Sequence, residues 1–320
     1  MSARQLATIA LGATLAGALA SDAGAQALRV QVLDATTGTA IAGALVAALD
    51  ANGRVVAEGL SSPDGTRTLR LPAAGRYRLR VRRIGMRPFT GTALAVEGVA
   101  TREVTLEIPS TRQALAPVRV TADAVCGRTP EGDSRLAELF DQFATALEAT
   151  RLSLADSAQA VQLEARQFER ELAIDLSVVA SRTTRTTTGA GRIFVARDAA
   201  ALAKDGFVVQ EPDRGYRFFA PDEAVLASDD FVRTHCFSAP PADSLDEGFA
   251  ELRFRPAPGR RRPDIAGTAY IDTLTGEPRR ITYRYVFPRA LLPVAAPHAG
   301  GEVQLERLVD GSWFVPRWSI

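Results

Sequence analysis

The chain has 320 residues, enough for two domains of ordinary size with their own hydrophobic cores. Hydrophobic residues make up 46% and charged residues 23%, a balance typical of a globular protein and not of a disordered or fibrous one. The 38 basic residues nearly equal the 37 acidic ones, and the formal net charge of +1 excludes a global field that would attract nucleic acid.

The first 27 residues have the layout of a secretory signal peptide. Arg4 lies in a short n-region, an apolar stretch covers residues 6–20, and Ala25-Gln26-Ala27 offers a cleavage site, with Ala23-Gly24-Ala25 as a competitor. A membrane anchor is the alternative, but this stretch is shorter than the roughly 20 apolar residues that span a bilayer. We therefore expect an exported protein of the periplasm or of the extracellular or outer-membrane surface, with no transmembrane span in the mature chain.

Residues 28–109 are predicted to form an antiparallel β-sandwich. Residues 28–34 and 77–81 alternate polar and apolar side chains, and residues 44–49 are a mostly apolar run. Turn residues separate these runs, as in Ser62-Pro63-Asp64-Gly65, where Pro fixes φ and Gly allows a positive φ. Several short strands at this spacing indicate a sandwich.

This stretch resembles the carboxypeptidase regulatory-like domain. The residues that carry the resemblance are Asp64-Gly65, Leu69-Arg70-Leu71-Pro72, Gly75-Arg76-Tyr77-Arg78-Leu79-Arg80-Val81 and Gly85-Met86. Ala42 stands where the family usually has Pro, and Thr66-Arg67-Thr68 lacks the common aromatic residue. The resemblance implies a transthyretin-like sandwich, related to carbohydrate-binding-like folds, that serves as a spacer or docking module and has no peptidase chemistry of its own.

Residues 110–125 are predicted to be a linker. Within it, residues 118–122 resemble the short segment that joins such a sandwich to the plug of TonB-dependent outer-membrane receptors. A simple edge strand is the alternative interpretation of these residues.

Residues 126–320 are predicted to form a helix-and-antiparallel-meander domain of the α+β class. Apolar residues such as Leu136, Leu139 and Phe143 recur at helical spacing, which predicts a helix over residues 134–152. A short helix is expected over residues 198–204, with Gly206 after it, and a polar loop or exposed strand end over residues 181–191. Strands are expected within residues 161–178, 207–210, 216–219, 251–254, 265–272, 280–287, 301–308 and 313–320. The sequence stops inside the last of these strands, which is compatible with a fragment of a longer chain.

Two expected hairpins turn at Thr275-Gly276 and Asp310-Gly311. The meander that they belong to resembles the half-barrel of LolA-like lipoprotein carriers, and that resemblance implies a cavity for an apolar ligand. The domain also resembles uncharacterised C-terminal regions of exported bacterial proteins, through residues 218–222, 230–231 and 235–237. That second resemblance implies no activity.

Cys126 and Cys236 are the only cysteines, and an exported chain with two cysteines favours a disulfide bond between them. Two free thiols or half of a metal site are the alternatives. A complete zinc site is excluded because no histidine pair lies near either cysteine to fill the tetrahedral shell.

The sequence lacks the motifs of familiar enzymes. Neither His235 nor His298 begins the H-x-x-E motif of a zinc peptidase, and no G-x-S-x-G elbow occurs. Gly189-Ala190-Gly191 is only a partial match to a nucleotide-binding loop. We therefore predict no catalytic residue, no cofactor site and no metal site.

Three charged clusters have an ordinary explanation. Asp229-Asp230 and Asp246-Glu247 are interpreted as solvated surface rather than as a glycosidase pair. Arg260-Arg261-Arg262 is interpreted as an exposed hairpin tip rather than as a phosphate or polyanion contact.

The sequence thus predicts a non-enzymatic exported binding or scaffolding protein whose partner is an unknown protein or glycan at the cell envelope, and not a nucleic acid. Trp313 and Trp318 would face opposite sides of a regular strand, so one is expected in the core and the other is a candidate for a sugar-stacking surface. A carrier of an apolar ligand, or an uncharacterised hydrolase with its site in the second domain, is the alternative.

Overall fold

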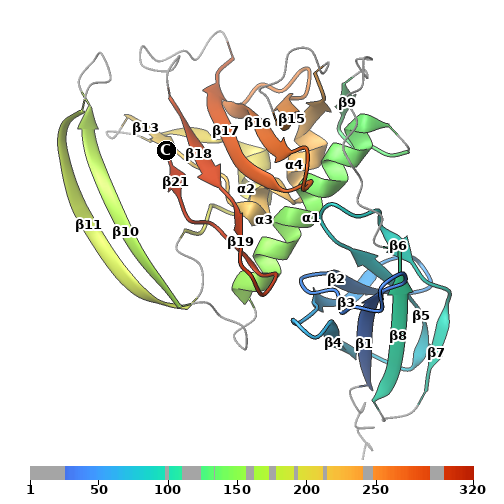
Figure 1. Ribbon diagram of the computed structural model, residues 1–320. Helices are drawn as coiled ribbons and strands as arrows, with labels where there is room; N and C mark the ends of the chain where they lie inside the picture. The colour runs from blue at the N-terminus through green and yellow to red at the C-terminus, as the bar shows by residue number, and fades with distance from the viewer. Residues whose placement is uncertain are drawn as a thin grey trace, which may run out of the picture.

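The computed structural model of the protein is mainly β, as the sequence predicts (Figure 1). The structure describes residues 26–97, 101–109, 124–132, 134–155, 162–172, 178–190, 194–211, 215–240, 248–288 and 299–320. The predicted signal peptide and the predicted linker therefore lie almost entirely outside the described residues, as do Asp246-Glu247 and His298.

The first domain is a β-sandwich. One sheet has the order β4-β1-β8, and the other has the order β3-β2-β5-β6, with β7 paired to β5. The strands are β1 (Gln26–Asp34), β2 (Leu45–Leu49), β3 (Val55–Leu60), β4 (Thr66–Leu71), β5 (Gly75–Arg82), β6 (Phe89–Thr90), β7 (Leu94–Val96) and β8 (Arg102–Ile108). Leu28, Val30 and Val32 point from β1 between the sheets and are fully buried. One detail differs from the predicted antiparallel sandwich, because β1 and β8 run parallel.

The second domain is built on a seven-stranded antiparallel sheet in the order β21-β18-β17-β16-β15-β14-β9. Its strands are β9 (Val125–Cys126), β14 (His235–Ser238), β15 (Phe249–Pro256), β16 (Asp264–Asp272), β17 (Pro278–Val286), β18 (Gly300–Gln304) and β21 (Trp318–Ser319). Five of these strands, β14 to β18, are neighbours in chain order and form the predicted meander. At one edge of the sheet, β9 begins at Val125, inside the residues predicted as linker.

Four helices accompany this sheet: α1 (Arg135–Ala155), α2 (Ala199–Asp205), α3 (Glu223–Leu226) and α4 (Asp229–Thr234). Sequence periodicity predicts α1 and α2 but misses α3 and α4, which are too short to show a helical period. The side chains of Asp222 and Ser228 cap these two short helices by accepting hydrogen bonds from the backbone N–H groups of Val225 and Phe231. None of the helices among the described residues has the length and apolar character needed to cross a membrane.

Three two-stranded pairs complete the fold. They are β10 (Gln162–Leu172) with β11 (Val178–Ala190), β12 (Val208–Glu211) with β13 (Gly215–Phe218), and β19 (Glu306–Arg307) with β20 (Trp313–Phe314). Residues 181–190 continue β11, so of the two predicted alternatives the exposed strand end is confirmed over the loop. One prediction needs correction here, because the turn at Asp310-Gly311 joins β19 to β20 while β18 pairs with β21.

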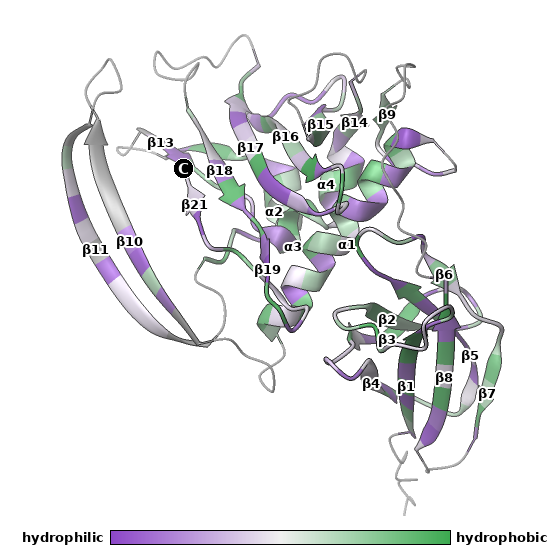
Figure 2. Ribbon diagram, in the orientation of Figure 1, coloured by the Kyte–Doolittle hydropathy of each residue, from purple (hydrophilic) through white to green (hydrophobic). Residues whose placement is uncertain are grey.

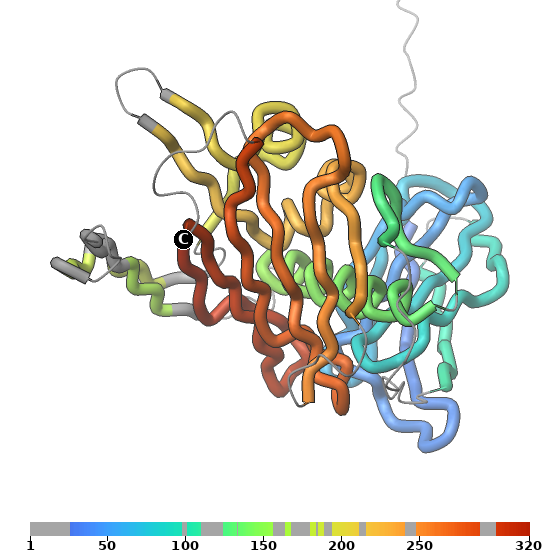
Figure 3. The backbone as a smooth tube through the Cα atoms, turned by 90° about the horizontal axis from the view of Figure 1, so that it is seen from above, coloured from blue at the N-terminus to red at the C-terminus, as the bar shows by residue number. Residues whose placement is uncertain are grey.

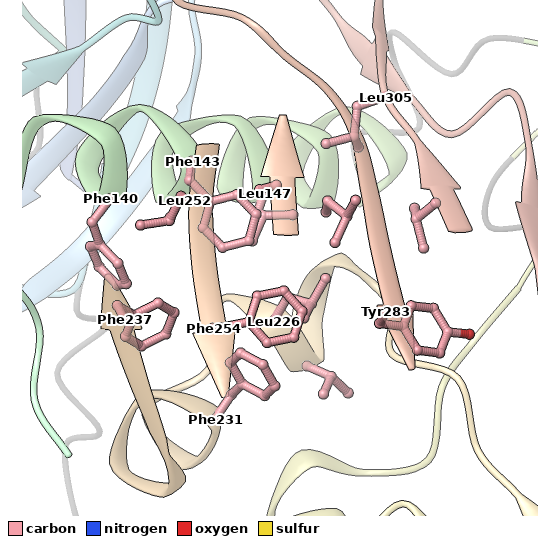
Figure 4. Close-up of a cluster of buried hydrophobic side chains, with 14 of the residues drawn as sticks. Phe140, Phe143, Leu147, Leu226, Phe231, Phe237, Leu252, Phe254, Tyr283 and Leu305 are labelled. Carbon is pink, nitrogen blue, oxygen red and sulfur yellow. The ribbon is translucent and has the colours of Figure 1, made fainter. Parts of the chain in front are cut away.

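The inner face of the seven-stranded sheet is covered by a dense apolar core (Figure 4). Phe140, Phe143 and Leu147 of α1 point toward Leu252 and Phe254 of β15 in this view. Further members of the same cluster are Leu226, Phe231, Phe237, Tyr283 and Leu305. Protein side chains therefore occupy the face where a half-barrel carrier would hold its apolar ligand.

The disulfide bond between Cys126 and Cys236 is present, as predicted. The two cysteines are direct neighbours across the antiparallel pair of β9 and β14, where their Cα atoms are 3.9 Å apart. The bond fixes the short edge strand β9 to the sheet, immediately before α1 begins.

The two domains share one buried contact, because α1 packs against the first domain as well as against the sheet of the second. Leu45 and Ala47 of β2 belong to the same buried cluster as α1, whereas Val46 and Ala48 point into the core of the sandwich. All five residues of β2 are consequently buried, which explains its uninterrupted apolar sequence.

The backbones of the two domains lie in close contact at two places. A Cβ atom on Gly43 would lie 2.6 Å from the carbonyl oxygen of Gly311, and one on Gly276 would lie 2.9 Å from Cα of Gly85. The N–H of Gly85 also donates a 2.7 Å hydrogen bond to Oε1 of Gln142 in α1. The two turns of the second domain are thus held directly against loops of the first.

An acidic pair and one arginine lie at the edge of the contact. Nη2 of Arg151 in α1 is 2.6 Å from Oε1 of Glu58 in β3, and Arg151 also pairs with Glu148. Burial, a hydrogen bond to Glu148 and the charge of Glu148 raise the pKa of Glu58 to about 7. Burial also opposes ionisation of Glu148, but its hydrogen bonds with Arg151 and Glu58 prevail and lower its pKa. Glu58 therefore takes up a proton near neutral pH, whereas Glu148 does so only at lower pH.

A second charged group lies at the edge of the contact between the domains. Asp141 of α1 faces Arg80 and Arg82 of β5. Burial raises the pKa of Asp141, and the two arginines act in the opposite direction. The interface therefore has an apolar centre and charged margins.

Gly276→Ala should destabilise the protein more than Gly53→Ala. Both glycines have a positive φ, 71° and 78°, so both substitutions incur about 1–2 kcal/mol of backbone strain. Nothing lies within 4 Å of a Cβ on Gly53, whereas a Cβ on Gly276 meets the backbone of Gly85. We expect this overpacking to cost a further 1–3 kcal/mol, roughly, in denaturant unfolding. Equal effects of the two substitutions would show that stability does not depend on the contact between the domains.

Removal of the disulfide bond by the double substitution Cys126→Ala/Cys236→Ala should lower the free energy of unfolding by about 4–5 kcal/mol on the chain-entropy model. The bond closes a loop of 110 residues, so its loss releases a large ensemble of unfolded conformations. Thermal unfolding of the oxidised, chemically reduced and double-substituted proteins measures the effect. The last two should coincide, and an unchanged melting temperature would contradict the prediction.

Glu58→Gln should flatten the pH dependence of stability between about pH 4.5 and 7. A raised pKa in the folded state stabilises the fold below the ordinary value of 4.5, and this contribution is lost as the pH rises to about 7. We expect the wild-type protein to lose about 1–2 kcal/mol across this window through Glu58, after allowance for solvent screening of a part-exposed group.

Denaturant unfolding over this pH range checks the prediction. Glu103→Gln is the matched control, because the Glu103 side chain on β8 is 78% exposed. Parallel stability profiles for the wild-type and Glu58→Gln proteins would show that the pKa of Glu58 is not raised in the folded protein.

Candidate functional site

The seven-stranded sheet has two chemically different faces, because successive residues of a strand point to opposite sides. In β15, Ala250, Leu252 and Phe254 are buried against the helices, whereas Arg253 and Arg255 between and beyond them are exposed. The same alternation continues along β17, where hydrophilic and hydrophobic residues follow each other (Figure 2). We call the side away from α1 the outer face.

Strand pairing places the outer-face residues in rows across the sheet. One row holds Glu251, Tyr270, Arg280 and Gln304. The next holds Arg253, Thr268, Thr282 and Glu302. Beyond it, Arg284 of β17 pairs with Ala266 of β16, and Arg255 lies two residues after Arg253 on β15. Figure 3 shows these orange and red strands side by side, with the green helix α1 crossing behind them. The outer face of β15 to β18 is our candidate functional site.

Four arginines give this face its character. Arg253 and Arg255 lie two residues apart on β15, and Arg280 and Arg284 lie on β17. Neighbouring strands are about 4.8 Å apart, so the two arginine-bearing strands are separated by roughly 10 Å, with β16 between them. This spacing allows one extended ligand to reach arginines of both strands.

Tyr270 contributes an aromatic side chain to the outer face. The guanidinium carbon of Arg280 lies 4.2 Å from the centre of the Tyr270 ring, a cation–π contact that orients both groups. Tyr270 is half-buried, so part of it remains accessible. Tyrosine combines an apolar ring with a polar hydroxyl and suits binding surfaces that contact both kinds of group.

The charges on this face are only partly balanced. Nε of Arg253 donates a 2.8 Å hydrogen bond to Oε2 of Glu251, and Nε2 of Gln304 donates one of 2.7 Å to Oε1 of Glu302. Within the part of the chain that the structure describes, neither Arg255 nor Arg284 forms an ion pair. These two exposed arginines are therefore available to an anionic ligand.

Sequence reasoning overlooked this site, although a signal was present. In Glu251-Leu252-Arg253-Phe254-Arg255 and Arg280-Ile281-Thr282-Tyr283-Arg284, arginines occupy one face of an alternating strand. Such a pattern is also usual for any half-exposed strand. Only the register across three strands shows that the two groups of arginines meet.

The predicted sugar-stacking residues lie elsewhere. Trp313 is 1% exposed in the core, and its backbone N–H donates a hydrogen bond to Oγ of Ser153 in α1. Trp318 is half-buried on β21, where its ring lies 4.5 Å from that of Phe194. The two tryptophans belong to different strands, and neither is among the outer-face residues defined above.

The Arg260 cluster was predicted to be an exposed hairpin tip, and for Arg260 this is wrong. Its side chain is 12% exposed and pairs with the buried Asp264. Nη1 also donates a 2.8 Å hydrogen bond to the carbonyl oxygen of Ala203 at the end of α2. Arg260 therefore holds a helix terminus, which explains its burial, whereas Arg261 and Arg262 are exposed as predicted.

His235 is fully buried beside the same carboxylate. Nε2 of His235 lies 3.2 Å from Oδ1 of Asp264, and its ring stacks on Phe231 at 3.8 Å. Nδ1 is 2.9 Å from the carbonyl oxygen of Phe231. With all its polar contacts inside the core, His235 ties β14 to β16 and α4 and does not face a substrate.

The predicted surface carboxylates behave as expected where they are described. Asp229 and Asp230 occupy the first turn of α4, and Asp230 pairs with Arg233. Acidic side chains at a helix N-terminus are favourable because they face the positive end of the helix dipole. This explains the pair without a catalytic role.

Burial also affects two inner-face tyrosines. It raises the pKa of Tyr283 and of Tyr285 well above the ordinary value, and the two side chains influence each other. Their hydroxyl groups donate hydrogen bonds to the carbonyl oxygens of Ser319 and Phe219. They fasten β21 and the end of β13 to the inner face of the sheet, so their role is structural.

Comparison with solved structures gives remote likenesses. A candidate carbohydrate-binding protein from Bacteroides uniformis is 11% identical, with a TM-score of 0.24 over 82% of this chain and 96% of that chain. The Bacillus anthracis TIE protein is 10% identical, with a TM-score of 0.22 over 83% of this chain and 46% of its own. A 9R-lipoxygenase from Cyanothece is 11% identical, with a TM-score of 0.23 over 85% of this chain and 41% of its own. Scores this low carry no argument about function.

Sequence comparison is more informative for the first domain. No curated protein matches the chain. The family pattern of the carboxypeptidase regulatory-like domain matches residues 27–108, which coincide with the sandwich from β1 to β8. The chain therefore carries a carboxypeptidase regulatory-like domain over residues 27–108.

Proposed function

We propose that this protein is a non-enzymatic, exported binding protein. The outer face of its second domain binds the ligand, and the carboxypeptidase regulatory-like domain is a rigid support for that face. The observation that carries the proposal is the contrast between the two faces of one sheet. The inner face is filled by the core around Phe143 and Phe254, whereas the outer face displays exposed arginines.

The first domain is a rigid support because the two domains share a buried apolar cluster. Leu45 and Ala47 of the first domain pack against α1, and close backbone approaches hold the turns at Gly276 and Gly311. A flexible tether would let the outer face rotate freely relative to the first domain. A fixed arrangement suits a scaffold that must hold a binding surface in one orientation.

The disulfide bond supports export, and the start of β1 bears on the cleavage site. A disulfide bond between Cys126 and Cys236 is maintained in oxidising compartments. Strand β1 begins at Gln26, which pairs with Leu71 of β4. Cleavage at Ala23-Gly24-Ala25 would leave this strand whole, so we favour that site over Ala25-Gln26-Ala27.

The carrier alternative makes a different prediction for the inner face. A carrier keeps an apolar cavity that opens for its ligand, whereas Phe254 is 2% exposed and its ring is 5.4 Å from that of Phe231. The filled core favours a protein that binds on its surface. A hydrolase would need an accessible catalytic group, and the buried His235 does not supply one.

Phe254→Ala tests the filled core. Removing this ring from a packed interior should cost about 3–5 kcal/mol in the free energy of unfolding. The neighbouring Arg255→Ala is the matched control on the outer face, because Arg255 is exposed, and it should change stability by less than about 0.5 kcal/mol. Denaturant unfolding measures both variants.

Native mass spectrometry of the wild-type protein provides the second readout. We expect a mass without a retained apolar molecule and two hydrogens below the reduced value. A small effect of Phe254→Ala together with a bound lipid would establish the carrier and overturn our proposal. Turnover of peptide, ester or glycan substrates would overturn its non-enzymatic part.

A further inference from the structure

The outer face offers more than positive charge, because it presents guanidinium groups at fixed intervals. Arg255 lies on β15 and Arg284 on β17, with β16 between these strands, so the two side chains extend from strands roughly 10 Å apart. Arg253 lies on the same strand as Arg255, with Phe254 between them pointing to the inner face. A guanidinium group binds a planar carboxylate through two parallel hydrogen bonds, a geometry that lysine does not offer.

The acidic residues on the same face limit which anions fit. Glu251 and Glu302 lie in adjoining rows, and they would repel a densely charged polymer such as a nucleic acid. A polymer with well-separated carboxylates places its charges on the arginines and its neutral parts over the remaining positions. Thr268 and Thr282 supply hydroxyl groups between the arginine-bearing positions, where a hydroxyl-rich ligand would find partners.

Tyr270 supplies a surface for a sugar ring. It lies between Glu251 and Arg280 in its row, and the guanidinium group of Arg280 already stacks on it. The apolar face of a sugar packs on such a ring while its hydroxyl groups reach the neighbouring polar side chains.

A lipid surface fits less well. Proteins that bind membranes peripherally insert large apolar side chains among the lipids, in addition to basic residues. The exposed large hydrophobic residues of the described chain are Val55, Val195, Tyr216, Leu274, Val309 and Ile320, and all of them lie outside β15 to β18. The outer face thus has the charge that anionic lipids require but not the apolar anchors.

We infer that the outer face binds an acidic polysaccharide, with uronic-acid carboxylates on Arg255 and Arg284 and a sugar ring against Tyr270. This inference rests on the proposed function, since it names the ligand class of that same surface. Affinity comes from charge-assisted hydrogen bonds, and selectivity for a sugar polymer comes from Tyr270 and the hydroxyl groups around it.

The test is isothermal titration of the disulfide-bonded protein with polygalacturonate, with neutral dextran and phosphatidylglycerol vesicles as comparison probes. Polygalacturonate should bind, with an affinity that falls as salt is added, whereas dextran should not bind. Arg255→Gln/Arg284→Gln should weaken the binding at least about tenfold. Tyr270→Ala should weaken it about threefold to tenfold while leaving the salt dependence unchanged.

Arg70→Gln/Arg78→Gln is the matched control. It removes the same charge from exposed positions of β4 and β5 in the first domain. This variant should bind like the wild-type protein, and circular dichroism should show that every variant is folded. Equal weakening by the two double substitutions would mean that binding follows net charge alone and would overturn the inference.

The comparison probes separate this inference from the proposed function. If vesicles bind through Arg255 and Arg284 while polygalacturonate does not, the outer face is a binding surface but the polysaccharide assignment is wrong. If the outer-face substitutions change the binding of no probe, both the assignment and the proposed binding surface fail.

Discussion

Helix α1 is buried on two sides, and the rest of the structure depends on this constraint. Its Phe140, Phe143 and Leu147 fill the inner face of the seven-stranded sheet, while the opposite side packs against β2 and β3 of the first domain. A helix in this position joins two cores into one. It also explains why polar residues such as Gln142 and Thr150 are buried, since each finds a hydrogen-bond partner.

A feature of the fold could be predicted from the sequence where the residues that determine it are close together in the chain. The first domain follows from turn residues and strict alternation within a few positions, as around Asp64-Gly65 and Tyr77. The apolar side of α1 is equally local. Its second buried side is not, because Gln142, Thr145 and Glu148 are the residues of an ordinary solvated helix face. Gln142 and Glu148 form hydrogen bonds with Gly85 and Glu58, which are far away in the sequence.

The candidate site was missed for the same reason. Each strand of the meander could be predicted from its own alternation, and the disulfide bond from the cysteine count and the expected compartment. The outer face depends on the register of β15, β16 and β17, which no single strand contains. Arg260 is an example of a wrong prediction with the same cause. Three consecutive arginines suggest a solvated tip, but contacts with Asp264 and the end of α2 bury the first of them.

Charge placement, not composition, gives this protein a binding surface. With a net charge of +1, the chain as a whole attracts no particular partner. Many of its arginines are neutralised locally: Arg151 by Glu58 and Glu148, and Arg260 by Asp264. At the outer face, by contrast, no ion pair is formed by Arg255 or Arg284 among the described residues, and the partner of Arg284 across the sheet is Ala266. The positive charge of these two side chains therefore remains available for a ligand.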